Sequence, residues 1–135
     1  VSRAAYLKTM FARHRIPVIR TGLQATEELD KKEIVLAGPY HPAFGEMVDS
    51  YLFYLMIAHF AEEVRPEKNS TLLIHHHTRD TSKLRGMSNC NIKKLQSIYN
   101  IKHCTLKGDG RTLDEISIEY QNISYVINKT MINFI

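Results

Sequence analysis

The chain has 135 residues, of which 44% are hydrophobic and 24% are charged, so its composition predicts a globular protein with a buried core and not a disordered one. Its longest apolar run, Tyr51 to Phe60, is far shorter than the roughly 20 residues of a membrane span, so we expect no membrane-spanning segment. The N-terminus does not have the pattern of a signal peptide. The two cysteines, Cys90 and Cys104, are too few for a disulfide framework. We therefore expect a cytoplasmic protein whose thiols are reduced.

The net charge is +4, and the basic excess is concentrated in one segment. Residues 1–65 contain eight basic and eight acidic side chains, residues 66–112 contain nine basic against three acidic, and residues 113–135 contain one basic against three acidic. Such an excess is expected where one segment meets an anionic partner. A solvated basic face without a partner is the alternative, and charge alone favours that alternative.

The first half of the chain predicts a helix, a strand and a buried helix. Residues 2–15 have apolar side chains at helical spacing, and residues 17–24 are strand-like. Helix followed by strand is typical of the last units of an α/β barrel or an open parallel sheet. Residues 41–64 are apolar on nearly every side, which predicts a helix buried between layers. The polar stretch RPEKNS, residues 65–70, is the best candidate for a domain boundary.

The second half predicts a strand at 71–78, a short helix at 80–86 capped by Asp80 or Thr81, a turn at 87–90, a helix at 91–100, and strands at 101–110 and 115–120. Residues 123–135 predict one or two further strands. This order resembles the core of a KH domain, in which a Gly-x-x-Gly turn between two helices lets a nucleic-acid backbone approach closely.

The turn in this chain reads Gly86-Met87-Ser88-Asn89, so an asparagine stands in place of the second glycine. Asparagine tolerates a left-handed backbone better than most residues, so the turn can still form. The next helix would present free backbone N–H groups to an anion. We therefore predict a nucleic-acid-binding surface, and a domain with an ordinary surface remains the alternative. Its predicted residues are Arg85, Gly86, Asn89, Lys93 and Lys94.

Three consecutive histidines, His75 to His77, raise the question of a metal site. Neighbouring side chains on a strand point to opposite faces, so at most His75 and His77 share a site. Their spacing to Cys90 and Cys104 matches no zinc pattern, and we predict structural histidines and no metal site. The chain also has no recognisable constellation of catalytic residues, and we predict none.

Two stretches, PVIRTGLQATEEL at 17–29 and IVLAGPYHPAFGEMVDSYLFY at 34–54, resemble the late part of a family of bacterial radical-SAM proteins. This family is related to the catalytic subunit of elongator and is often labelled oxygen-independent coproporphyrinogen III oxidase. RGMSNCNIKKL, at 85–95, is similar to a further pattern of the family. The resemblance implies that Arg20 and Gln24 lie near the barrel mouth and contact cofactor or substrate, and that His41 shapes the following loop. A loop that only turns the chain is the alternative for these three cofactor-binding candidates.

The resemblance also implies S-adenosylmethionine and a four-iron, four-sulfur cluster as cofactors of a longer parent protein. This chain begins with Val and lacks the three-cysteine cluster motif. We therefore expect it to be a C-terminal fragment that binds neither cofactor and has no activity alone. Its expected partner is the upstream radical-SAM domain, and exposed apolar edges in the first half would allow a dimer.

The predicted fold class is α+β, with the end of a TIM-type α/β barrel at 1–65 and a small, basic, KH-like β-α-α-β-β domain at 66–135. The predicted function is that of a fragment of a radical-SAM iron–sulfur enzyme, an oxidoreductase or an RNA-modifying enzyme. Its basic appendage would dock an RNA substrate, with tRNA as the candidate. One alternative is a porphyrinogen substrate, whose propionates the basic segment would meet, and another is a non-enzymatic KH-like RNA-binding module.

Overall fold

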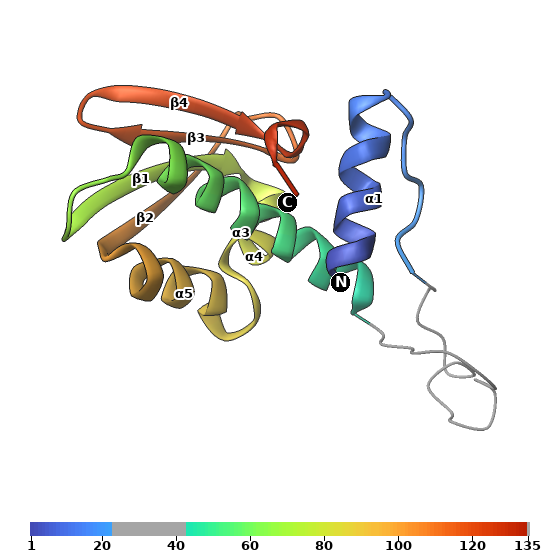
Figure 1. Cartoon of the computed structure of the whole chain (residues 1–135), viewed down its shortest axis with the longest axis horizontal. Helices are drawn as coiled ribbons and strands as arrows, with labels where there is room; N and C mark the ends of the chain where they lie inside the picture. The colour runs from blue at the N-terminus through green and yellow to red at the C-terminus, as the bar shows by residue number, and fades with distance from the viewer. Residues whose placement is uncertain (23–42, 135) are drawn as a thin grey trace.

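The computed structural model describes residues 1–22 and 43–134, and the fold of these residues is α+β, as predicted (Figure 1). The barrel assigned to residues 1–65 stays a prediction. The helices are α1 (Ser2–Arg13), α3 (Phe44–Val64), α4 (Thr81–Arg85) and α5 (Cys90–Tyr99). The strands are β1 (Ser70–His77), β2 (Ile101–Asp109), β3 (Glu115–Tyr120) and β4 (Ile123–Asn128).

The four strands form one mixed sheet in the order β2-β1-β3-β4. Strands β1 and β2 are parallel, and the connection between them passes through α4, the Gly86 turn and α5. Strands β3 and β4 form an antiparallel hairpin joined at Gln121 and Asn122, whose φ angles of 50° and 63° suit a tight two-residue turn. The parallel crossover thus places the turn and both of its flanking helices at one face of the sheet.

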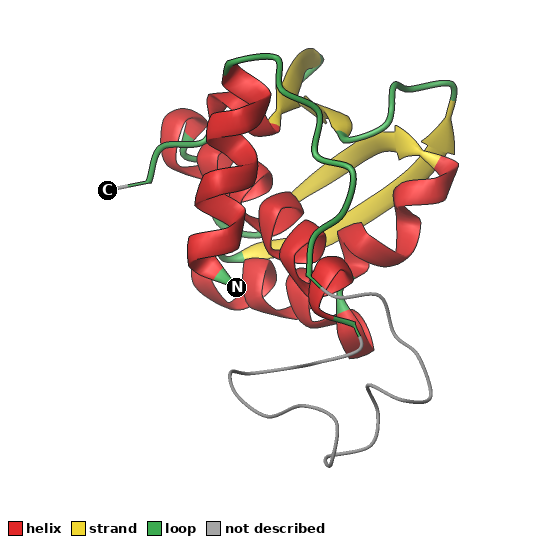
Figure 2. Cartoon of the chain, turned by 90° about the vertical axis from the view of Figure 1, so that its right-hand side faces the viewer, coloured by secondary structure: helices red, strands yellow, loops and turns green. Residues whose placement is uncertain are grey.

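The hydrophobic core lies between that face and α3, so the molecule has a helical layer and a sheet layer (Figure 2). Leu72 and Ile74 of β1 and Ile116 and Ile118 of β3 are fully buried on the helical side. Helix α3 is apolar on nearly every side, and its apolar side chains are buried by α1, α4 and α5 as well as by the sheet. The predicted burial of this helix is confirmed, but α3 belongs to the helical layer and does not lie between two layers. One continuous cluster runs from α1 through α3 to the sheet, across the predicted boundary at residue 65.

Two local predictions are wrong. Residues 17–22, the described part of the strand expected at 17–24, are neither helix nor strand, and none of the four strands pairs with them. A strand persists only where a neighbour satisfies its backbone N–H and C=O groups. Neither candidate caps α4: Asp80 Oδ2 accepts a hydrogen bond from the Asp114 backbone N–H at 2.8 Å, and Thr81 Oγ1 donates to the backbone oxygen of Thr78. Among the described residues, no helix is long and apolar enough to cross a bilayer.

Candidate nucleic-acid interface

The turn between α4 and α5 begins with a backbone conformation that requires glycine. Gly86 has φ 76° and ψ 170°, a conformation that is essentially restricted to glycine. A Cβ added there would lie 2.7 Å from Cys90 Sγ and 3.1 Å from Asn91 Cγ, so no larger residue fits. Asn89 has φ 64° and ψ 24°, which confirms the left-handed conformation expected of it. The turn therefore forms although the second glycine is absent.

A buried amide that the sequence analysis missed holds this turn in place. Asn91, in the first turn of α5, is only 7% exposed, and its Nδ2 donates to the backbone oxygens of Ser50 at 2.9 Å and Leu84 at 3.2 Å. Ser50 Oγ in turn donates to the backbone oxygen of Lys83 at 2.7 Å. These bonds join α3, α4 and α5 around the turn. The sequence contained only a weak indication of this contact, namely polar Ser50 directly before the apolar run and Asn91 at the start of a predicted helix.

Three of the five predicted nucleic-acid residues meet on the turn itself. Arg85 is exposed, and its Nη1 donates to Asn89 Oδ1 at 3.3 Å, which places the guanidinium across the turn that Gly86 begins. Lys93 and Lys94 are exposed on the first half of α5, and Lys94 Nζ lies 4.3 Å from the centre of the Tyr54 ring, within range of a cation–π contact. The five predicted residues thus lie on the end of α4, on the turn and on the first half of α5.

The beginning of α5 suits an anion. Its first turn contains no acidic residue, and Asn89, at the N-cap position, makes no side-chain hydrogen bond to the helix. The backbone N–H groups at the start of a helix carry partial positive charge, although those of Asn89 and Cys90 here donate to the backbone oxygens of Gly86 and Met87. Together with the guanidinium of Arg85 and the ammonium of Lys93, they give this end of the helix a positive potential.

Two of the nine basic residues in the 66–112 segment are neutralised by carboxylates. Lys83 Nζ lies 3.0 Å from Asp49 Oδ2, and Arg111 Nη1 lies 3.8 Å from Glu115 Oε1. Burial disfavours the charged form of Lys83, but the hydrogen bond and the charge of Asp49 outweigh it, so the pKa of Lys83 is raised. Lys83 is therefore part of the internal structure and not of the basic surface.

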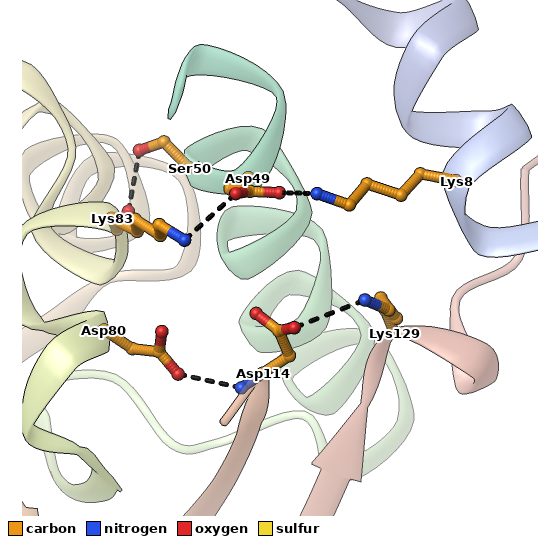
Figure 3. A network of polar contacts seen from close by, with 7 residues as sticks. All are labelled: Lys8, Asp49, Ser50, Asp80, Lys83, Asp114 and Lys129. Atoms are coloured by element: carbon orange, nitrogen blue, oxygen red, sulfur yellow. Dashed lines mark hydrogen bonds and ion pairs between the residues drawn. The ribbon is translucent and has the colours of Figure 1, made fainter. Parts of the chain in front are cut away.

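Asp49 is the centre of a polar network that positions α4 (Figure 3). Its carboxylate pairs with Lys8 of α1 and with Lys83 of α4, and Asp114 pairs with Lys129 at 3.4 Å nearby. Burial by itself would raise the pKa of Asp49, but the two lysines outweigh it and hold that pKa below its ordinary value. The network fixes α1 and α4 on opposite sides of α3, and with α4 it fixes the start of the turn.

The three histidines alternate as predicted. His76 is buried under the helices, whereas His75, on the open face of the sheet, lies between Asp109 Oδ2 at 2.6 Å and Glu119 Oε1 at 3.1 Å. The two ring nitrogens of His75 thus link β1 to Asp109 of β2 on one side and to Glu119 of β3 on the other. In the part of the chain that the structure describes, no three histidine, cysteine or carboxylate side chains are arranged as a metal site.

The cofactor candidates are not brought together by the described residues. Arg20 is exposed on the segment after α1, and Gln24 and His41 lie outside the described residues. Near Arg20 the chain meets the start of α3 closely, because a Cβ on Gly22 would lie 2.7 Å from the Phe44 ring. The roles assigned to Arg20, Gln24 and His41 therefore stay predictions.

Comparison of the chain with models of protein families, with curated proteins and with solved structures found no match. The resemblance to radical-SAM proteins therefore stays a prediction from the sequence stretches that suggested it.

Proposed function

We propose that this chain is the C-terminal part of a radical-SAM enzyme and that its basic appendage docks an RNA substrate, with tRNA as the candidate. The observation that carries the proposal is the turn from Gly86 to Asn89. It joins two helices, keeps a glycine-only backbone at its start, and is flanked by exposed Arg85, Lys93 and Lys94. Gly86 has no side chain, and it lies beside these cations and the positive end of the α5 dipole, which together favour the approach of a phosphate.

The chemistry of the parent enzyme would be supplied from elsewhere in the protein. An iron–sulfur cluster is held by several cysteine thiolates, and this chain has two cysteines, on α5 and β2. Burial raises the pKa of Cys104 to about 11, so this residue stays a neutral thiol at neutral pH. The residues present do not fit the cluster. In this proposal the upstream domain binds the cluster and S-adenosylmethionine, while the appendage positions the RNA.

The experiment is a titration of the chain with tRNA over a range of salt concentrations. Phosphate contacts release counterions, so Lys93→Glu combined with Lys94→Glu should weaken binding and lower the salt slope by up to about 1.5. The matched control is Lys102→Glu with Lys107→Glu, which reverses the same charge at two exposed positions on β2. Equal effects of the two double variants would refute a binding surface at the turn.

A non-enzymatic RNA-binding module is the second candidate, and the continuous core favours it. The core cluster contains Ala5 of α1 and Ile132 beyond the last strand, so the described residues form their own hydrophobic interior. The sequence upstream of Val1 in the gene separates the two candidates. A three-cysteine motif there would support the enzyme, and its absence would leave the module.

A further inference from the structure

A cavity of about 590 Å³ is bordered by α1 and the segment after it, by α3 and α4, and by the residues just before β3 and just after β4. None of the five nucleic-acid candidates lines this cavity. Its volume is within the range of sites for small molecules. Among the described residues, the charged lining consists of four cations and two carboxylates, namely Lys8, Arg15, Lys83, Lys129, Asp49 and Asp114.

Three of these cations are held at the cavity by the polar network around Asp49 and Asp114 (Figure 3). Lys8 and Lys83 pair with the two different oxygens of the Asp49 carboxylate, and Lys129 Nζ lies 3.4 Å from Asp114 Oδ2. An ammonium group has three N–H donors, so each lysine keeps donors for a further acceptor. The network therefore positions ammonium groups from three distant parts of the chain around one space.

Arg15 differs from the three lysines, because its guanidinium makes no hydrogen bond or ion pair with any residue that the structure describes. Its backbone has φ 57° directly after the α1 C-cap residue His14. Its N–H donates to the Ala12 oxygen at 3.1 Å, and the Ile16 N–H donates to the Phe11 oxygen at 2.8 Å. Glycine is the usual residue at this position of a helix end, because it adopts the left-handed conformation without strain. The helix end thus gives no reason for an arginine, whose side chain is available to a ligand.

We propose that this cavity binds the phosphate group of a small phosphate monoester. Such a group carries close to two negative charges at neutral pH, which match the excess of two cations among the described lining residues. The guanidinium of Arg15 donates two parallel hydrogen bonds to two phosphate oxygens, and the lysines donate singly. A phosphodiester of a nucleic acid carries one negative charge and matches this lining less well.

The surroundings of the cavity favour an anion with an apolar or neutral organic part. Asp80 is 1% exposed and is buried next to Asp114, whose backbone N–H it accepts. With Asp80 counted, the cations still exceed the carboxylates by one charge, so the potential in the cavity attracts anions. The apolar segment 16–18 forms a further part of the lining, and the organic part of the ligand contacts it.

The test is titration of the chain with ribose 5-phosphate by isothermal titration calorimetry at constant ionic strength. We expect a Kd of about 1 mM or below. Ribose, which lacks the phosphate, and dimethyl phosphate, which lacks the second charge, should each bind at least about tenfold more weakly. No binding of ribose 5-phosphate, or equal binding of either comparison compound, would overturn the phosphate site.

A pair of variants locates the binding. Arg15→Gln removes the guanidinium and leaves the Asp49 network in place, so it should weaken binding of ribose 5-phosphate about tenfold. Arg3→Gln, at an exposed position of α1 outside the cavity, removes the same charge and should change the affinity by less than about twofold. Equal effects of the two variants would refute the site. The outcome does not depend on the proposed RNA function, which is tested at Lys93 and Lys94, outside the cavity.

Discussion

Replacement of Asn91 tests how the binding turn is held. Its Nδ2 makes two hydrogen bonds of good length, to the backbone oxygens of Ser50 and Leu84. Each contributes about 1 kcal/mol, and the buried carbonyls that lose their donor add a further cost of about 1 to 2 kcal/mol. Alanine is the better helix former by about 0.5 kcal/mol. We therefore expect Asn91→Ala to lower the free energy of unfolding by about 2.5 to 3.5 kcal/mol.

The assay is urea unfolding followed by circular dichroism, in which this loss lowers the midpoint by roughly 1 to 2 M at an unchanged m value. Asn91→Asp has nearly the same shape but turns a carboxylate oxygen toward the same carbonyls, so its midpoint should fall further. Ser97→Ala, on the exposed side of α5, is the control. If Asn91→Asp is as stable as Asn91→Ala, the donated hydrogen bonds are not what holds the turn.

Two further predictions concern pH and the turn. The folded state lowers the pKa of Asp49 below its ordinary value of 3.8, so the ionised carboxylate stabilises the fold. This stability is fully present above the unfolded pKa of about 4, and it is lost as the pH falls through the folded pKa. The difference in urea midpoint between the unaltered chain and Asp49→Asn should thus shrink below about pH 4, and a constant difference would contradict this role. Gly86→Ala should cost about 1 to 3 kcal/mol in the same unfolding assay, whereas Asn89→Gly, at a left-handed position that glycine accepts, should change stability by less than about 1 kcal/mol. Equal losses of unfolding free energy in the two variants would contradict the inference that only position 86 requires glycine.

Much of the local structure could be predicted because it depends on neighbours in the chain. The apolar spacing of residues 2–15 predicted α1, and the alternation of side chains along a strand predicted that His75 and His76 lie on opposite faces of β1. The tolerance of asparagine for a left-handed backbone predicted the conformation of Asn89. Helical and strand periodicities follow from backbone geometry over a few residues, so a short stretch contains the whole signal.

Contacts between distant residues were decided by the tertiary structure alone. The pattern at Asp80 is that of a helix cap, yet its carboxylate is used by Asp114, which lies 34 positions further along the chain. Lys83 counts toward the basic segment in the sequence, yet Asp49 of α3 removes it from the basic surface. Such pairings depend on how the parallel β1-β2 crossover places α4 and α5 against α3, and no local pattern specifies that placement. By itself, the sequence determined most of the helices and strands and the segregation of basic charge. Only the packing of α3 against α4 and α5 created the buried hydrogen bonds that hold the turn, because their partners lie far apart in the chain.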